Sequence, residues 1–352
     1  MVAYLMDMMN WFTGGDVTAS WRLRQRRHLL RVHGALLVAL LLLAGWSLKV
    51  GAVDLSWRQI VAFGTMRLSE SPSLQLLAEF RWARLQTAFW AGLSFGVAGC
   101  LMQTVTHNRL ATPDVVGVSD GAGVMIFMGL IVGADMLLGQ WWLGVLGALL
   151  TVLLILMCAR GIGAHGQRFV LVGIGVTALL RAVLELLLSQ QELSHATALY
   201  LWTLGSLSSR SENLLPLMIG CVVLIPFAMV LQRALTILSL DRDVAISLGL
   251  HVRSLNALAL CLAMLLAGLA VGVCGPIVFV ALAAPVLAQL SLNRARSVNV
   301  LASGLIGAMI VIGADTIGRV IYPTQELPAG VICNVLAGVF ILWLLWRKPS
   351  ST

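Results

Sequence analysis

The stretch from His33 to Leu48 reads HGALLVALLLLAGWSL and contains no Asp, Glu, Lys or Arg. It follows five arginines that are crowded into Trp21–Arg31. A bilayer has a hydrocarbon core of about 30 Å, so a helix that crosses it needs about 20 mostly apolar residues. Similar stretches recur along the 352-residue chain, in which 59% of the residues are apolar. We therefore predict an all-α, polytopic membrane protein with about ten transmembrane helices.

The predicted spans divide the chain into a basic N-terminal segment, 1–31, a transmembrane domain, 32–346, and a tail, 347–352. Within the domain the spans are 32–50, 85–105, 115–134, 138–158, 168–189, 213–232, 254–273, 276–291, 298–316 and 329–346. The eighth of them, 276–291, is short for a full crossing.

Basic residues set the orientation, because Lys and Arg accumulate in cytoplasmic loops. With the N-terminus inside, 15 of the 23 Lys and Arg residues fall on the cytoplasmic side, and 8 fall outside or within spans. Both termini are therefore predicted to be cytoplasmic. The same bias accounts for the formal net charge of +8 without a nucleic-acid partner.

A faint internal repeat links two stretches that lie half a chain apart. Ala91–Gly99 (AGLSFGVAG) and Ala267–Gly275 (AGLAVGVCG) are identical at most of their positions. In the predicted topology the first copy runs inward and the second outward, as in the inverted repeats of many transporters. Chance similarity between helices rich in Gly and Ala is the alternative. Both copies hold two glycines four residues apart, which lets helices pack closely.

The sequence lacks the nucleotide-binding motif GxxxxGK[ST] and the zinc-binding motif HExxH, and its His and Cys residues are scattered. We therefore expect no catalytic site, cofactor or metal in this chain. Arg181 and Glu185 lie one helical turn apart in the fifth span, where an intrahelical pair would reduce the cost of burial. We predict that these two residues and Gln103 are structural or face a cavity.

Several blocks follow one another from residue 81 to the last span. In chain order they are Arg81–Leu85 (RWARL), Ala91–Gln103, Asn108–Pro113 (NRLATP), Gly117–Ala122 (GVSDGA), Trp202–Leu207 (WTLGSL), Asp243–Gly249 (DVAISLG), Gly275–Phe279 (GPIVF) with Pro285, and Ala314-Asp315 with Arg319 and Glu326–Gly330 (ELPAG). In this order they resemble the permease family of ABC importers for iron siderophores, haem and vitamin B12. The closest resemblance is to its ferric-siderophore branch.

The resemblance implies a ten-helix permease that pairs with a second permease, with two cytoplasmic ATPase subunits that hold ATP and Mg, and with a periplasmic binding protein. It implies the bacterial inner membrane as the location and a ferric siderophore as the cargo, with haem or vitamin B12 as alternatives. A stand-alone secondary carrier is the alternative from another class, and the shortage of mid-membrane acidic residues argues against it. Departures from the family pattern at Arg109 and at Pro285–Gln289 favour a second permease that is not identical to this chain, with a homodimer as the alternative.

The resemblance assigns the outer arginines Arg81, Arg84 and Arg319 to docking of the binding protein. Arginines are less common on the outer side than in cytoplasmic loops, so these three call for an explanation. A guanidinium group can hold a carboxylate through two hydrogen bonds. Binding of headgroup phosphates, or a helix-end pair with Glu79, is the alternative interpretation.

A polar cytoplasmic stretch, Gln232–Arg253, separates the sixth and seventh spans. Asp241 or Asp243 can cap a short helix there and Gly249 can end it, although an ordinary surface loop is the alternative. The resemblance implies that this helix couples the permease to the ATPase. The residues that it assigns to coupling are Arg242, Asp243, Ile246, Leu248 and Gly249.

The loop between the second and third spans lies on the cytoplasmic side in the predicted topology. The resemblance implies that this loop narrows the inner mouth of the channel. Its predicted gate residues are His107, Asn108, Arg109, Leu110 and Pro113. The fifth span, 168–189, is predicted to line a wide translocation path along the dimer axis.

Overall fold

The computed structural model describes residues 16–51, 56–64, 77–131, 141–159, 166–190, 200, 202–207, 214–292, 298–321 and 327–346. In this part of the chain the regular structure is helical and contains no strand. Ten main helices lie within these residues: α2 (Asp16–Lys49), α5 (Ala83–Thr106), α6 (Val118–Ile131), α7 (Trp141–Cys158), α8 (Gly166–Ser189), α10 (Leu214–Leu240), α12 (Val252–Cys274), α13 (Val280–Ser291), α14 (Val300–Ile321) and α15 (Ala329–Trp346). Shorter elements are α3 (Trp57–Gly64), the π-helical turn η1 (Leu77–Trp82) and α11 (Arg242–Ser247).

These helices coincide in order and place with the ten predicted spans. Seven helices among the described residues are long and apolar enough to cross a membrane, and α6, α13 and α15 are shorter apolar helices. α13 has 12 residues and is the span that we predicted to be short. The chain is therefore an all-α, polytopic membrane protein, as predicted.

Two helices extend beyond their predicted bounds. α2 begins at Asp16, inside the predicted N-terminal segment 1–31, because the basic run continues the helix rather than ending it. α10 continues from the predicted end at residue 232 to Leu240. Its last turns carry Leu235 and Leu238, which are fully buried and hold this part of the helix against the bundle. The predicted polar stretch therefore starts later than Gln232.

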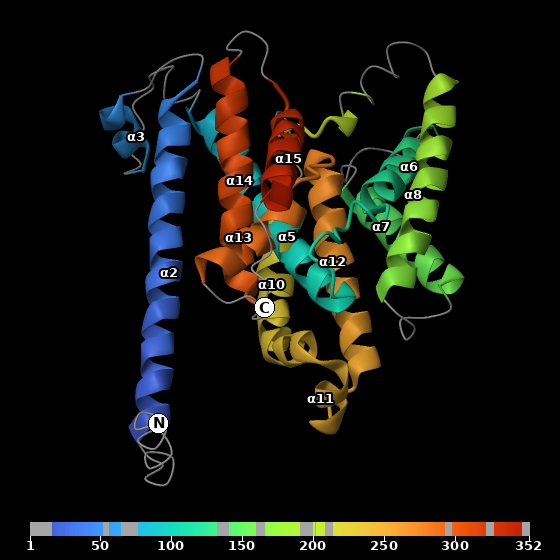
Figure 1. Cartoon of the computed structure of the whole chain (residues 1–352). Coiled ribbons are helices and arrows are strands. Elements are labelled where there is room, and N and C mark those ends of the chain that lie inside the picture. Colours follow the sequence, from blue (N-terminus) through green and yellow to red (C-terminus); the bar gives the residue numbers. More distant parts are fainter. Residues whose placement is uncertain are drawn as a thin grey trace.

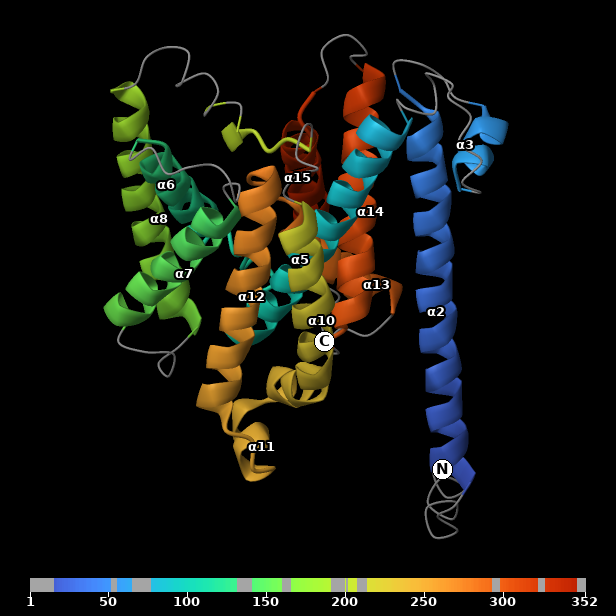
Figure 2. The same cartoon turned by 180° about the vertical axis from the view of Figure 1, so that it is seen from behind.

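α5, α12 and α14 form the centre of the bundle, and most of their side chains are buried. α2 stands at one edge and α8 at the opposite edge in both views (Figures 1 and 2). These outer helices expose large apolar side chains such as Leu42 on α2 and Leu171 on α8. Apolar surface of this kind suits contact with lipid or with another membrane chain. Below, inner means the side of α11 and outer the opposite side, following the predicted orientation.

Glycines bring two pairs of helices into backbone contact. A Cβ atom on Gly92 of α5 would lie 2.5 Å from the carbonyl oxygen of Gly307 on α14. Likewise, a Cβ atom on Gly144 of α7 would lie 2.5 Å from the Cα atom of Gly272 on α12. Among the ten main helices, α5 and α14 are the second and the ninth, and α12 and α7 are the seventh and the fourth. If the second half of the chain repeats the first, α12 corresponds to α5 and α7 corresponds to α14. The two glycine contacts are then equivalent, which supports the internal repeat.

Candidate functional site

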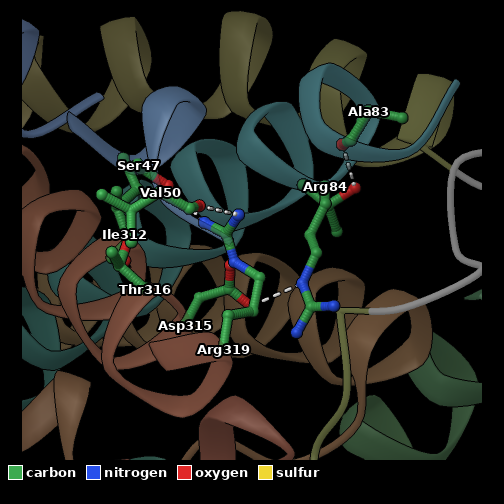
Figure 3. Close-up of polar contacts among 9 residues, drawn as sticks. Ser47, Val50, Ala83, Arg84, Ile312, Asp315, Thr316 and Arg319 are labelled. Atoms are coloured by element: carbon green, nitrogen blue, oxygen red, sulfur yellow. Dashed lines mark hydrogen bonds and ion pairs between the residues drawn. The ribbon is translucent and has the colours of Figure 1, made fainter. Parts of the chain in front are cut away.

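Three charged side chains form a buried cluster at the outer end of the bundle (Figure 3). Asp315 on α14 is 2% exposed and lies between two guanidinium groups. The Nε atom of Arg84, at the start of α5, is 2.6 Å from Asp315 Oδ1, and the Nε atom of Arg319 is 3.1 Å from Asp315 Oδ2. One carboxylate therefore neutralises part of the charge of two arginines that lie far apart in the sequence.

The same region holds the outer end of α2. Arg319 donates to the hydroxyl of Ser47 at 2.6 Å and to the carbonyl oxygen of Val50 at 3.3 Å. Arg81 donates to the carbonyl oxygens of Leu48 and Lys49 at 2.8 and 3.1 Å. The last carbonyls of a helix have no partner within the helix, so these guanidinium groups satisfy acceptors that would otherwise be open. The outer arginines thus join α2 to α5 and α14.

This geometry corrects the docking prediction for two of the three arginines. Arg84 and Arg319 are only 9% and 7% exposed, and their guanidinium groups point inward to Asp315 (Figure 3). In this conformation they cannot reach the carboxylates of another protein. Arg81 is half-buried and remains nearer the surface. The sequence did contain a signal for the cluster, because Asp315 and Arg319 are four residues apart on one helix. The side chain of Glu79 lies outside the described residues.

α11 at the inner end has the cap that we predicted. Asp241 Oδ1 accepts hydrogen bonds from the backbone N–H groups of Asp243 at 2.7 Å and Val244 at 3.3 Å. Gly249 follows the helix with φ +81°, a left-handed conformation that a Cβ atom disfavours. Asp241, and not Asp243, is the N-cap, and the stretch forms a short helix rather than an irregular loop.

One face of α11 is apolar and uncovered. Ile246 and Leu248, the predicted anchors, are 53% and 63% exposed, and Val244 adjoins them with 46% exposure. Ala245 is fully buried and faces the rest of the chain. Sequence reasoning missed Val244. The side chain of Arg242 lies outside the described part of the structure, whereas Asp243 is exposed.

The predicted gate residues lie together where α5 ends. His107 has φ +51° and ends α5, and its Nε2 atom lies 3.1 Å from the carbonyl oxygen of Leu238 on α10. Asn108 Oδ1 accepts from the backbone N–H of Leu110 at 2.9 Å and so shapes the turn. Leu110 is 54% exposed, and Arg109 is also exposed. The loop is thereby attached to the inner end of α10.

The second half of this loop is more buried. The carbonyl oxygen of Pro113 accepts from Val116 and Val118, each at 3.2 Å. Ser119 donates a short hydrogen bond to Asp114 Oδ1, while Asp114 Oδ2 is buried. The pKa of Asp114 is raised from 3.8 to about 6, chiefly because the carboxyl group is buried. The Ser119 hydrogen bond lowers this pKa, and the negative charge of Asp120 adds to the rise. Sequence reasoning did not single out Asp114.

The three candidate cavity residues separate into two environments. The predicted intrahelical pair of Arg181 with Glu185 is not among the ion pairs of the described residues. The Nε atom of Arg181 instead lies 4.0 Å from Asp120 Oδ1 on α6. Its side chain is 71% exposed, and Glu185 is exposed as well. Gln103 is buried at 6% exposure.

Gln103 is therefore a structural residue and not a cavity residue. Its Nε2 atom donates to the carbonyl oxygen of Leu282 at 3.1 Å and lies 3.5 Å from that of Ala281. Pro285, four residues after Ala281 in α13, has no N–H group, so the carbonyl of Ala281 lacks its helical partner. A side-chain amide from a neighbouring helix compensates for such a gap.

Comparisons with known proteins agree with this architecture. The chain matches the FecCD transport family over residues 36–347. It is 32% identical to the iron(3+)-hydroxamate import system permease protein FhuB of Salmonella typhimurium over 99% of this chain, which spans half the length of that protein. It is 30% identical to the ferric enterobactin transport system permease protein FepG of Escherichia coli, over 90% of this chain and 96% of FepG.

A solved structure has the same fold. It is described as an inward-facing conformation of a metal-chelate type ABC transporter, with a TM-score of 0.76 and 23% sequence identity. The match covers 90% of this chain and 99% of the solved chain. Because the family match extends over most of the sequence and over nine of the ten main helices in full, this chain belongs to the FecCD transport family.

Proposed function

We propose that the chain is the permease subunit of an ABC importer that moves a ferric siderophore from the periplasm to the cytoplasm across the bacterial inner membrane. Membership of the FecCD transport family and the names of FhuB and FepG support this function. The cargo comes from a periplasmic binding protein, and separate ATPase subunits hold ATP and Mg. The permease itself performs no catalysis.

α11 is the observation that carries the proposal. A capped helix lies at the inner end of the bundle (Figure 1), and its apolar side chains Val244, Ile246 and Leu248 are exposed. An ATPase groove would bury these side chains. The chain has no phosphate-binding motif of its own, so an energy source must act through such a contact.

The contacts around α11 suggest how closure of the ATPases reaches the inner gate. α11 is joined directly to the ends of α10 and α12. Leu238, less than one turn before Asp241, accepts the hydrogen bond of His107. A displacement of α11 would therefore move the end of α10 and, through His107, the loop with Asn108 and Leu110. Two rigid arrangements of these elements would open and close the inner mouth.

The exposed face of α8, which points away from the bundle, is proposed to line the translocation path beside a second permease. Arg181 and Glu185 are exposed within a largely apolar part of this helix, and a charged side chain at mid-membrane depth is costly in contact with acyl chains. A water-filled path or a partner chain removes this cost. We propose a second permease that is not identical to this chain, as the departures at Arg109 and Gln289 suggest.

Hemin is the second candidate cargo. The chain is 28% identical to the hemin transport system permease protein HmuU of Yersinia pestis, over 90% of this chain and 96% of HmuU. Uptake of a ferric siderophore and of hemin should be measured in parallel with the same reconstituted transporter. The compound that accumulates with ATP is the cargo.

Leu248→Asp tests the coupling function. An unpaired carboxylate in the buried interface should cost several kcal/mol of association energy, so the co-purified ATPase should be lost. Leu248→Met keeps an apolar side chain and should retain the ATPase and uptake. Proteoliposomes with the permease pair, binding protein and ATPase should accumulate cargo only with ATP. Uptake driven by an ion gradient without the ATPase would overturn the proposed function.

A further inference from the structure

α2 is longer than a membrane crossing requires. Its 34 residues span about 51 Å at 1.5 Å per residue. The hydrocarbon core is about 30 Å thick, and the bilayer with both headgroup regions is about 40–45 Å. One end of α2 is fixed on the outer side by the bonds from Arg319 and Arg81. The excess length therefore lies on the inner side.

Among the side chains that the structure describes, the contacts of α2 with the helix bundle begin at Leu29. Leu29, Val32 and Leu36 pack against the inner ends of α13 and α14. His33 Nε2 lies 3.2 Å from Asn299 Oδ1, one residue before α14 begins. Residues 16–28 precede these contacts and, as a helix, extend about 20 Å further. Their end reaches as far to the inner side as α11 does (Figures 1 and 2).

The register of α2 places two arginines on the side that faces the bundle. The side that packs on the bundle is marked by residues spaced alternately four and three apart, which are Leu29, His33, Leu36, Leu40, Leu43 and Ser47. Continued toward the N-terminus, this spacing reaches Arg26 and Arg22. Both positions therefore lie on the side of α2 that faces the space beneath the bundle. Arg24, Arg27 and Arg31 occupy other registers of the helix, on the side that faces away.

The projecting part is strongly basic. Residues 16–31 contain five arginines and one acidic residue, Asp16, which gives a formal net charge of +4. Anionic lipid headgroups attract such segments. Headgroups surround the bundle, whereas Arg22 and Arg26 occupy positions that face the space beneath it. α11 presents its apolar face at the same depth as that space.

We propose that the inner extension of α2 is a second contact for the cytoplasmic ATPase subunit, and that Arg22 and Arg26 bind an acidic patch on the ATPase surface. This inference rests on the proposed function, because it requires an ATPase at α11. The charged contact at α2 would speed the encounter with the ATPase and orient it. The apolar contact at α11 would be the one that becomes buried when the two proteins bind.

The test compares two double substitutions in the complete transporter. Arg22→Gln with Arg26→Gln removes the charges on the side that faces the bundle, and Arg24→Gln with Arg27→Gln removes two charges on the opposite side. Each variant loses two of the five arginines, so the charge bias for membrane orientation falls equally in both. Binding of the transporter's own ATPase subunit is measured in nanodiscs at low and high salt. The nanodiscs contain either phosphatidylcholine alone or phosphatidylcholine with phosphatidylglycerol.

The first variant should bind the ATPase about three- to tenfold more weakly at low salt in both lipids, and the difference should shrink at high salt. The control should bind as the unmodified chain does. Equal weakening in both variants, or an effect only with phosphatidylglycerol, would show lipid anchoring and overturn the inference. No effect in either variant would also overturn it. Leu248→Asp, run beside them, tells this failure from failure of the proposed function, since it should still abolish binding.

Discussion

At the scale of single residues, the outer cluster shows how a membrane protein uses a buried charge. Asp315 binds Arg84 and Arg319, which belong to different helices, and Arg319 extends the connection to Ser47 on α2. Three helices therefore depend on one carboxylate. A buried pair of this kind specifies which helices meet, and loss of one partner leaves the other charges uncompensated.

Asp315→Asn should therefore destabilise the protein by about 3–5 kcal/mol, because two buried guanidinium groups lose their counter-charge. The apparent Tm of the purified protein in detergent measures the effect. Asp243→Asn, at an exposed position on α11, is the control and should leave the Tm nearly unchanged. Equal Tm values for Asp315→Asn and the unmodified chain would mean that the cluster contributes nothing to stability.

Asp114 predicts a dependence of stability on pH. Its pKa in the folded protein, about 6, lies above the ordinary value of 3.8 for an aspartate, so the folded state binds the proton more tightly. Stability from this group therefore increases as the pH falls from 7 through 6 and levels off below about 4. Between pH 7 and 5 the gain should be about 1 kcal/mol. Asp114→Asn should lack this part of the change in Tm, and an unaltered pH profile in the variant would contradict the assignment.

At the scale of elements, the helix crossings depend on glycine. Gly92 and Gly307 bring α5 and α14 into backbone contact, and Gly144 and Gly272 do the same for α7 and α12. Association of membrane helices relies on close packing, because lipid is as apolar as the helix surfaces. A methyl group added at such a crossing therefore forces the two backbones apart at that point.

Gly92→Ala should lower the Tm of the protein markedly, since the added Cβ atom would lie 2.5 Å from a backbone oxygen that cannot rotate away. Gly175→Ala is the matched control. Gly175 lies on α8, and a Cβ atom added there would have no other atom within 4 Å, so this substitution should be neutral or slightly stabilising. Similar losses of Tm in both variants would argue against the crossing as the cause.

At the scale of the whole molecule, both ends of the bundle carry positive charge. The inner end carries the basic extension of α2, and the outer end carries Lys49, Arg81, Arg84 and Arg319 against Asp315 in the cluster region. The formal sum of these five outer side chains is +3, because four positive charges face one negative charge. An acidic face of a binding protein would be attracted to this end even though Arg84 and Arg319 are buried.

Arg81→Glu should slow association of the binding protein and reduce its dependence on salt, since rim charges act mainly on the association rate. Surface plasmon resonance with immobilised permease complex at several salt concentrations measures both quantities. Arg58→Glu, on exposed α3, makes the same change of charge away from the cluster and is the control. Equal effects of the two substitutions would show general attraction and no docking contact at Arg81.

The helical membrane class, the order and approximate bounds of ten helices, and a capped helix at α11 could all be predicted from the sequence. These features depend on local composition and on spacing within one segment, which periodicity and capping residues report directly. Tertiary contacts had to be seen in the structure before it was clear that Arg84 and Arg319 turn inward to Asp315, that Gln103 fills the gap left by Pro285, and that Arg181 approaches Asp120. Each of these contacts joins helices far apart in the sequence. The partner of a polar side chain in a bundle depends on which helices become neighbours and how they are rotated, and composition within one segment carries no information on either.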